Sequence, residues 1–335
     1  MDKIRAGIIG CGRIATVYRD FFENNRKNVS LVFAVDKEPD RAEAFAGTFG
    51  CGWSDDLADL LKEKPDVVHI CTPHHLHKEQ TIACLESGIH VLTEKPIAIS
   101  LADADEMIGA AKRTGRKLGV IFQNRYIDGV IEAKRLISTG QLGEIIGAWS
   151  HMAWHRPPSY YQCDWKGSWE TEGGGVLIDQ AIHSIDLVRY LTGSDVEWIH
   201  GNIDNRILKT VEVEDVADAV IGFKNGCIYS LFACNYYKTN APIQIEILGE
   251  KGKVNIKGFD VTIEIDGRES TVNSGENTAV GNSYWGAYHA MQISAFYDSL
   301  RNNVPVAIDG FEGRKTLELI LGIYRSAREK GKIYL

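Results

Sequence analysis

The sequence predicts an α/β protein in which a doubly wound parallel sheet is followed by an α+β domain built on an open, mostly antiparallel sheet. From Ile4 to Phe122, short apolar runs alternate with longer amphipathic segments, the pattern of a parallel sheet with helices on both faces. Beyond that point, several apolar runs follow one another with Gly and Asn-Gly between them, which is typical of antiparallel hairpins. The predicted domains are 1–123 and 124–335.

In the first domain, strands are expected where short runs are rich in Val and Ile, and helices where longer segments are amphipathic. The predicted strands are 4–10, 31–36, 66–72, 90–96 and 117–122, and the predicted helices are 13–24, 39–48, 75–87 and 101–114.

In the second domain, a helix over 128–138 is expected to end near Gly140, and two late helices are expected over 286–301 and 311–329. Asn225–Gly226 lies between two alternating runs and predicts a tight hairpin. An open sheet covered by helices on one face leaves the other face to a second subunit or to solvent, and a homodimer or homotetramer formed through that face is expected. The predicted strands are 144–155, 197–207, 216–226, 227–234, 243–256 and 260–270.

Composition excludes several classes of partner. The 335-residue chain has a net charge of −8, which argues against a nucleic-acid or anionic-membrane surface. No apolar run approaches the roughly 20 residues of a membrane span, and the N-terminal segment MDKIRAGIIG lacks the pattern of a signal peptide. Seven cysteines without a CxxC pair suit a reducing, cytoplasmic setting.

A glycine motif lies between the first predicted strand and helix. The stretch GIIGCGRIA places Gly10, Gly12 and Ala15 in a G-x-G-x-x-A arrangement, with Arg13 and Ile14 in the same turn. In a dinucleotide site, the first glycine permits the tight turn and the second lets the backbone approach a pyrophosphate. The free N–H groups of the following helix would then face the phosphates.

Asp36, at the end of the second predicted strand, supports this interpretation. A carboxylate there accepts hydrogen bonds from the ribose 2′-hydroxyl and repels a 2′-phosphate, which favours NAD over NADP. Lys37 beside it would soften the preference. The alternative is a simple tight turn followed by an aspartate that caps a helix.

Two further loops follow predicted strands at the edge where such sheets bind ligands. In CTPHHLHKE, the residues Thr72, Pro73, His74 and His77 are expected to border the cofactor. Three histidines suggest a metal at first sight, but the neighbouring sequence supplies no thiolate or carboxylate at ligand spacing, so no metal site is predicted. His77 alternatively caps or packs on its helix.

The second loop, TEKP, contains Glu94, Lys95 and Pro96. Pro96 restricts Lys95 and raises the chance of a cis bond. Lys95 is then either a surface cation or a group that relays a proton at the nucleotide. The two predicted domains are expected to leave a cleft between them. Gln123 and Arg125, after the last strand of the first domain, are expected to border this cleft.

The stretch EGGGVLIDQAIHSIDL leads three glycines into a helical run. Asp179, His183 and Asp186 have spacings of four and three, which predict one face of an α-helix. His183 suits an acid/base because the ordinary pKa of histidine lies near neutrality. Asp179 would orient the imidazole or the substrate, and the glycines would permit close approach of a ligand. The alternative is a core histidine satisfied by its neighbouring carboxylates.

Before the glycines lies an aromatic and basic loop, WHRPPSYYQCDWKGSW. Aromatic faces and polar donors suit the CH faces and hydroxyl groups of a carbohydrate, although such a loop can equally be anchored by its aromatic side chains. The candidate substrate-binding residues are Trp154, Arg156, Tyr160 and Trp165, with Tyr236, Tyr237 and His289 as weaker candidates.

Taken together, GCGRIA, TPHHLH, EKP, GGGVLIDQAIHSIDL and the tail EGRKTLELILGIYRSA resemble the family of glucose–fructose oxidoreductase, inositol dehydrogenase and rhizopine-catabolism oxidoreductases (Gfo/Idh/MocA). The resemblance extends over essentially the whole chain. It implies a Rossmann domain and an oxidoreductase that acts on a sugar or polyol with a nicotinamide cofactor. One departure is His74, where the family often has Asn.

The resemblance also implies residue roles. Lys95 would bridge the nicotinamide ribose and the reacting hydroxyl, and Glu94 would contact the ribose side. His183 would be the acid/base, with Asp179 orienting the substrate. Two alternatives to an NAD-dependent dehydrogenase remain. One is a glycoside-cleaving enzyme that recycles its NAD, and the other is a non-catalytic dinucleotide or sugar sensor.

Overall fold

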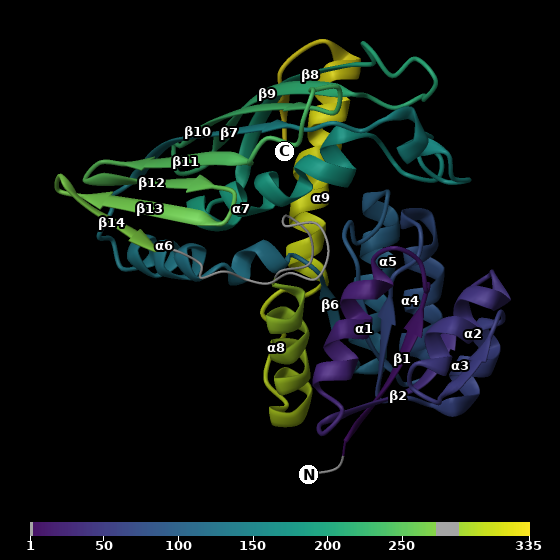
Figure 1. Ribbon diagram of the computed structural model, residues 1–335. Helices are drawn as coiled ribbons and strands as arrows, with labels where there is room; N and C mark the ends of the chain where they lie inside the picture. The colour runs from purple at the N-terminus through teal and green to yellow at the C-terminus, as the bar shows by residue number, and fades with distance from the viewer. Residues whose placement is uncertain (1–2, 273–287) are drawn as a thin grey trace. The chain divides into compact units, whose positions relative to one another are not determined.

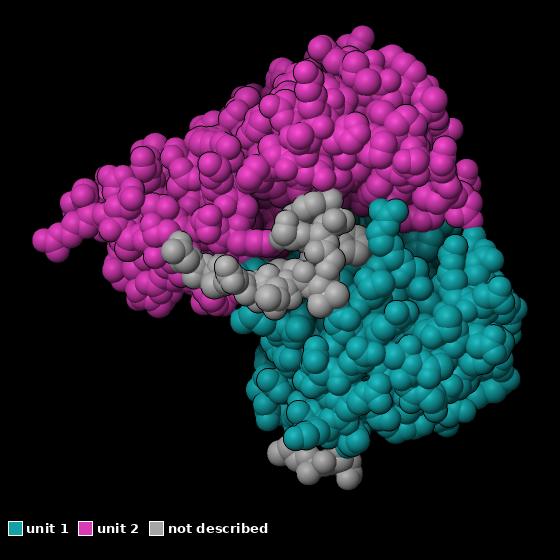
Figure 2. All heavy atoms as spheres, in the orientation of Figure 1, with its two compact units in different colours: residues 1–123, 279–314 teal, residues 124–278, 315–335 magenta. Residues whose placement is uncertain are grey.

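The computed structural model describes residues 3–272 and 288–335. The chain forms two compact units, coloured separately in Figure 2. Among the described residues, the first unit contains 3–123 and 288–314, and the second contains 124–272 and 315–335. The domain boundaries predicted from the sequence include 288–314 in the second domain, whereas the contacts of this segment place it in the first unit.

In the first unit, the described residues form a six-stranded parallel sheet in the order β3-β2-β1-β4-β5-β6. Figure 1 labels its strands β1, β2 and β6. This is the order of the Rossmann fold, and it reverses between β1 and β4. The predicted doubly wound sheet is therefore confirmed. The strands are β1 (Ile4–Ile9), β2 (Val29–Val35), β3 (Gly52–Ser54), β4 (Val67–Ile70), β5 (His90–Thr93) and β6 (Leu118–Val120).

The helices of this unit follow the sequence pattern. Helix α5 has the predicted bounds because Ser100 caps its N-terminus by accepting from the Asp103 N–H, and Gly115 ends it at a φ of 65°. Strand β3 and helix α3 are too short for the periodicity to reveal. The helices are α1 (Ala15–Asn24), α2 (Pro39–Gly47), α3 (Leu57–Glu63), α4 (His77–Glu86), α5 (Leu101–Thr114) and α8 (His289–Asn302).

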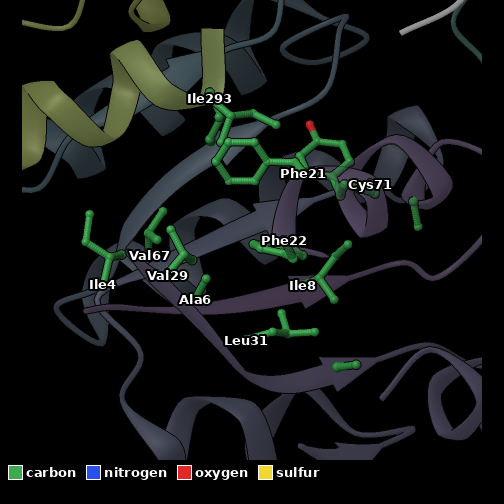
Figure 3. Close-up of a cluster of buried hydrophobic side chains, with 14 of the residues drawn as sticks. Ile4, Ala6, Ile8, Phe21, Phe22, Val29, Leu31, Val67, Cys71 and Ile293 are labelled. Carbon is green, nitrogen blue, oxygen red and sulfur yellow. The ribbon is translucent and has the colours of Figure 1, made fainter. Parts of the chain in front are cut away.

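Helix α8 belongs to the core of the first unit. Ile293 lies beside Phe21 in the apolar cluster drawn in Figure 3, and Phe296 and Tyr297 belong to the same cluster. Burial of these side chains is the main stabilising term for such a core. The predicted helix 286–301 is confirmed from residue 289 onward; its first two positions lie outside the described residues.

Among its described residues, the second unit forms a nine-stranded sheet in the order β14-β13-β12-β11-β7-β10-β9-β8-β15. Every pair is antiparallel except β7 with β10, so the prediction of an open, mostly antiparallel sheet is confirmed. The strands are β7 (Ile145–Ala153), β8 (Val196–Asp204), β9 (Val216–Phe223), β10 (Ile228–Cys234), β11 (Gln244–Gly249), β12 (Gly252–Lys257), β13 (Asp260–Ile265), β14 (Arg268–Val272) and β15 (Ile333–Tyr334).

Helices lie against one face of this sheet. A Cβ on Gly129 of α6 (Asp128–Ser138) would lie 2.3 Å from Val261, so this helix sits directly on β13. Helix α9 (Gly310–Glu329) packs on β8, because a Cβ on Gly201 would lie 2.8 Å from Ile323. Buried glycines thus let both helices approach the strands closely.

The glycine-led segment differs from its prediction. It begins with a π-helical turn, η4 (Leu177–Ala181), and continues as α7 (Ile182–Thr192). Asp179 lies in the π turn, whereas His183 and Asp186 lie in α7, so the regular α-helical spacing predicted for the three residues is interrupted. Single π turns occur frequently at functional sites.

Candidate active site

The glycine loop lies at the point where the strand order of the parallel sheet reverses. Gly10 follows β1 with a φ of 91°, and a Cβ there would lie 2.7 Å from the carbonyl carbon of Cys71, after β4. The positive φ and the close backbone therefore both require glycine. In open α/β sheets, ligands bind at this switch point.

The start of helix α1 fits a pyrophosphate. No side chain caps its first turn, which also contains no acidic residue, so an external anion would meet the positive end of the helix dipole without a negative side chain beside it. A Cβ on Gly12 would meet no atom within 4 Å among the described residues. Gly12 therefore borders open space, as a backbone that approaches a phosphate must.

Asp36 ties the glycine loop to the end of β2. Its Oδ2 accepts from the Cys11 N–H at 2.7 Å and its Oδ1 from the Glu38 N–H at 2.9 Å. The side chain is buried and accepts from backbone groups of the glycine loop and of the residue before α2, so it is not the solvated helix cap of the alternative interpretation. Since each carboxylate oxygen has two lone pairs, the carboxylate retains the capacity to accept ribose hydroxyl groups as well.

His77 joins the two loops that follow β4 and β5. Its Nδ1 lies 2.8 Å from the Pro96 carbonyl oxygen and its Nε2 lies 2.9 Å from that of Thr72. Burial lowers the pKa of His77, while the two carbonyl groups oppose this shift. A neutral imidazole donates only one of these two hydrogen bonds. His77 thus holds the loops together, and His74 is buried beside it.

Glu94 is part of a buried polar cluster. Its Oε1 accepts from the Tyr18 hydroxyl at 2.8 Å and lies 3.4 Å from His289 Nε2. Although burial alone would raise the pKa of Glu94, His289, Tyr18 and Lys95 together lower it. Lys95 itself is half-buried, and its bond to Pro96 is cis.

Gln123 ends the first unit with an unused acceptor. Its Oε1 is buried and has no hydrogen-bond partner among the described residues. Such a group is costly unless a ligand or water satisfies it. The neighbouring backbone is fixed, because Gln292 accepts from the Phe122 N–H and donates to the Val120 carbonyl oxygen.

In the second unit, Asp179 is held by several donors. Its Oδ2 accepts from Lys166 Nζ at 2.6 Å, from the Tyr160 hydroxyl at 2.7 Å and from Gln180 Nε2 at 2.6 Å. Lys166 also donates to Glu172 at 3.2 Å. The pKa of Glu172 is raised to about 8, chiefly because the group is buried and also because Asp179 lies nearby, against the lowering effect of Lys166.

His183 differs from its neighbours in exposure. From Glu172 to Arg189, all of which the structure describes, every residue except His183 is buried. The first turn of α7 therefore contains one partly exposed imidazole, whose Nδ1 is buried, four residues after the constrained carboxylate of Asp179. Histidine is a common acid/base in enzymes.

Two of the three glycines are needed for packing within the unit. A Cβ on Gly174 would lie 2.1 Å from the Tyr324 hydroxyl, and one on Gly175 would lie 2.0 Å from the Glu214 carbonyl oxygen. The Glu214 carboxylate accepts from Gly175, Leu177 and Tyr324. Gly174 and Gly175 therefore permit close packing of this segment.

Arg125 and Asp186 form a buried ion pair. Arg125 Nε and Nη2 donate to the two carboxylate oxygens at 2.7 and 2.6 Å, and Thr316 Oγ1 donates to Asp186 at 2.7 Å. Asp186 is therefore a structural residue. Arg125, expected to border the substrate, fixes the start of α6 to α7.

The aromatic loop is anchored at its start. Trp154 is buried and donates from Nε1 to the Ala241 carbonyl oxygen. The Arg156 guanidinium stacks on Trp154 and Tyr160, and Lys166 lies over the rings of Tyr160 and Trp165. Tyr236, on an isolated bridge to His155, is half-buried.

Three functional candidates escaped the sequence analysis: Lys166, Glu172 and Gln180. Lys166 lies between two tryptophans in the loop. A basic residue among aromatic residues suggests a cation held by ring faces, and this pattern could have identified Lys166. Glu172 precedes the glycines and Gln180 follows Asp179, and no sequence pattern distinguishes either residue.

Among the described residues, no group of His, Cys, Asp and Glu side chains could hold a metal ion. No helix in that part of the chain is long and apolar enough to span a membrane.

A glycine turn that opens onto a helix N-terminus at the switch point of a parallel sheet defines the dinucleotide-binding class of Rossmann proteins. The oxidoreductase family model with an NAD-binding Rossmann fold matches residues 4–122. The Gfo/Idh/MocA C-terminal domain model matches residues 130–255. The chain therefore belongs to the Gfo/Idh/MocA family of oxidoreductases.

Two relatives match this chain over nearly their full lengths. The chain is 28% identical to D-glucoside 3-dehydrogenase of Escherichia coli, covering 100% of this chain and 98% of that protein. It is 26% identical to myo-inositol 2-dehydrogenase of Thermotoga maritima, covering 99% and 98%.

A similar solved structure is the WlbA dehydrogenase of Bordetella pertussis in complex with NADH and UDP-GlcNAcA. Its TM-score is 0.87 at 30% identity, covering 100% of this chain and 99% of that one. Levoglucosan dehydrogenase in complex with NADH and levoglucosan has a TM-score of 0.90 at 22% identity, with coverages of 100% and 99%, which shows the shared fold.

Proposed function

We propose that this protein oxidises a secondary hydroxyl group of a sugar, cyclic polyol or glycoside, with NAD as the hydride acceptor. Two residues of one segment carry the proposal. Asp179 is a buried carboxylate held by Lys166, and His183 is the one partly exposed residue of the segment 172–189. The names of the glucoside and inositol dehydrogenases similar to this chain support the substrate class.

Oxidation of a secondary alcohol removes a hydride from carbon and a proton from oxygen. Bound NAD would supply the hydride acceptor. We assign the proton to His183, since imidazole is an effective base near neutral pH. Asp179 would accept a hydrogen bond from the substrate, and Lys95 would assist by donating to the reacting oxygen. The proposed catalytic residues are thus Lys95, Asp179 and His183.

The first unit would bind the dinucleotide at the glycine loop. We propose that Gly12 and the first turn of α1 face the pyrophosphate, with Arg13 and Ile14 in the same turn. Asp36 would bind the adenosine ribose and favour NAD over NADP. The loops after β4, β5 and β6 would complete this site through Thr72, Pro73, His74, His77, Glu94 and Gln123.

The substrate would lie against the aromatic loop. Trp154, Tyr160 and Trp165 would offer ring faces, and Arg156 and Tyr236 would offer polar groups. Arg125 does not enter the proposed site, because Asp186 engages two of its nitrogens.

The test is a panel of cyclic polyols, free sugars and glycosides incubated with the enzyme and NAD, with NADH absorbance as the readout. At least one compound should give stoichiometric NADH, and H183A should lower the rate by about 100-fold or more. Substituent release without net NADH would replace the proposal with NAD-recycling cleavage. Cofactor binding with no turnover of any compound would favour a sensor.

We further propose that the uncovered sheet face joins copies of this chain. Trp149, Val220, Ile228 and Leu248 are exposed there on adjoining strands, and an apolar surface of this kind marks an interface. I228E should lower the mass measured by light scattering from that of a dimer or tetramer to that of a monomer. A monomeric wild-type protein would contradict the proposal.

A further inference from the structure

Three arginines are buried in the described part of the chain: Arg125, Arg156 and Arg189. Arg125 and Arg189 both lie within ion-pair distance of Asp186, at 2.6 and 3.6 Å. Arg156 is 8% exposed, yet it has no carboxylate partner among residues 3–272 and 288–335. An uncompensated buried charge is costly, so this one calls for an explanation.

The contacts of Arg156 leave one edge of the guanidinium unused. Nη1 donates to the His155 carbonyl oxygen at 2.9 Å and to Asn240 Oδ1 at 3.1 Å. Nε is buried and has no hydrogen-bond partner in the described chain. Nε and Nη2 form the edge that binds two oxygens of a carboxylate or phosphate in parallel.

Two aromatic rings hold this cation in place. Its central carbon lies 4.8 Å from the centre of the Trp154 ring and 5.0 Å from that of Tyr160. These stacking contacts stabilise the cation without neutralising it. The guanidinium is therefore fixed before a ligand binds, which lowers the entropic cost of binding.

The same tyrosine connects Arg156 to the proposed reaction site. The Tyr160 ring stacks on Arg156, and its hydroxyl donates to Asp179 at 2.7 Å. A substrate held by Asp179 would thus place a substituent a few bonds from the reacting hydroxyl near the unused guanidinium edge. Lys166 cannot serve this purpose, because Glu172 and Asp179 already neutralise it.

We propose that Arg156 forms a subsite for an anionic group of the substrate, so that the protein acts on a sugar acid or sugar phosphate rather than on a neutral sugar. This inference rests on the proposed function, because it places the substrate beside Asp179. Carboxylate and phosphate share the chemistry that the Nε–Nη2 edge recognises.

The test measures binding to the NADH-loaded protein by isothermal titration calorimetry, because that complex cannot oxidise an alcohol. The probes are D-glucose, D-glucuronate and D-glucose 6-phosphate. At least one anionic sugar should bind the wild type about 10- to 100-fold more tightly than D-glucose, as expected for two charge-assisted hydrogen bonds. The anionic sugar that binds more tightly identifies the group as carboxylate or phosphate.

In R156M the affinity for the anionic sugar should fall to about that of the same variant for D-glucose, so that this preference disappears. R156K should retain part of the preference, since it keeps the charge but not the two-point edge. R325M is the matched control, because Arg325 is exposed and pairs with Glu329 on α9. If R156M does not fold, the affinities of the wild type and of R156K for the anionic sugar and for D-glucose still test whether Arg156 binds the anionic group.

The inference is overturned if the wild type binds D-glucose at least as tightly as both anionic sugars, if neither anionic sugar binds, or if R156M keeps the preference. A separate assay with NAD distinguishes this failure from failure of the proposed function. NADH formed from neutral sugars without anion preference would remove only the subsite. Selective binding without NADH formation from any sugar would instead remove the dehydrogenase.

Discussion

Lys166 Nζ lies 2.6 Å from Asp179 Oδ2 and serves a second carboxylate, Glu172, at 3.2 Å. Both carboxylates are buried, and the lysine side chain is 10% exposed. One cation therefore lies between two buried acidic groups, and the raised pKa of Glu172, about 8, favours its protonated form beside the Asp179 carboxylate. Asp179 owes its position and its charge balance to a residue that is 13 positions earlier in the chain.

We predict that K166M lowers kcat/KM by about 100-fold, because misplacement of a substrate-orienting group by an ångström is costly. It should also lower the free energy of unfolding by about 3 kcal/mol, since removal of one partner exposes the others to an uncompensated burial cost. Urea denaturation and steady-state rates on the best compound of the panel measure the two effects.

K166R should recover much of both losses by restoring the charge. K332M is the control, because Lys332 also lies over a tryptophan, at 3.7 Å from the Trp198 ring centre, but touches none of the proposed site residues. Equal rates in K166M and the wild type would show that Asp179 needs no cation.

Cofactor preference tests the role of Asp36. In D36A the affinity for NADH should fall by about 10-fold and that for NADPH should fall less or rise, because the ribose acceptor and the repulsion of a 2′-phosphate are both lost. Binding titrations by NADH and NADPH fluorescence report this without any substrate.

D36A also removes the hydrogen bonds to the Cys11 and Glu38 amides, which loosens the glycine loop for both cofactors. The ratio of the two affinities, rather than either value, is therefore decisive. D40A, at an exposed position of α2, should leave the ratio unchanged. An unaltered ratio in D36A would remove the ribose assignment.

The sequence predicts elements well where local signals agree. Helices α5 and α6 have their predicted bounds because a strong apolar period is bounded by local stop signals, Gly115 and Gly140. Strand β3, at three residues, carries no such period. The π turn at Leu177–Ala181 is invisible to a pattern that assumes α-helical spacing.

Contacts between distant residues explain what the sequence could not predict about the site. The motif identifies Asp179, but its partners Lys166 and Tyr160 come from a loop whose path no periodicity specifies. Similarly, Arg125 and Arg156 look alike in sequence, and only their surroundings show that one is paired with Asp186 and the other has an unused edge.

The glycine cluster predicts a large loss of stability on a small change. Gly174 has a φ of 147°, and a Cβ there would lie 2.1 Å from the Tyr324 hydroxyl. G174A should therefore lower the free energy of unfolding by about 3 kcal/mol or more through strain and overlap together.

G140A separates these two causes. Gly140 also has a positive φ, 73°, but a Cβ there would meet nothing within 4 Å among the described residues. Its cost should be about 1 kcal/mol, from backbone strain alone. Thermal unfolding of both variants measures the difference, and equal losses would show that overlap with Tyr324 is relieved by movement.

Acid sensitivity of folding should depend on His69, a buried residue of β4 whose Nε2 lies 2.7 Å from the Tyr297 hydroxyl. Burial lowers the pKa of His69 from 6.5 to about 3, against a small opposing effect of Glu94. The unfolded chain therefore binds a proton below pH 6.5 that the folded chain does not. The stabilisation is complete above pH 6.5 and is lost as the pH falls towards 3.

Between pH 7 and 5 this residue alone should cost the wild type about 2 kcal/mol of unfolding free energy. H69Q keeps a side-chain group near Tyr297 and cannot be protonated in this range. Between pH 7 and 5 the free energy of unfolding of H69Q should therefore fall by about 2 kcal/mol less than that of the wild type. His77, whose pKa burial also lowers, still contributes in both proteins. H200Q, at an exposed position of β8, should show the same dependence of unfolding free energy on pH as the wild type. If the curves of H69Q and the wild type run parallel, His69 is not the source of the acid sensitivity.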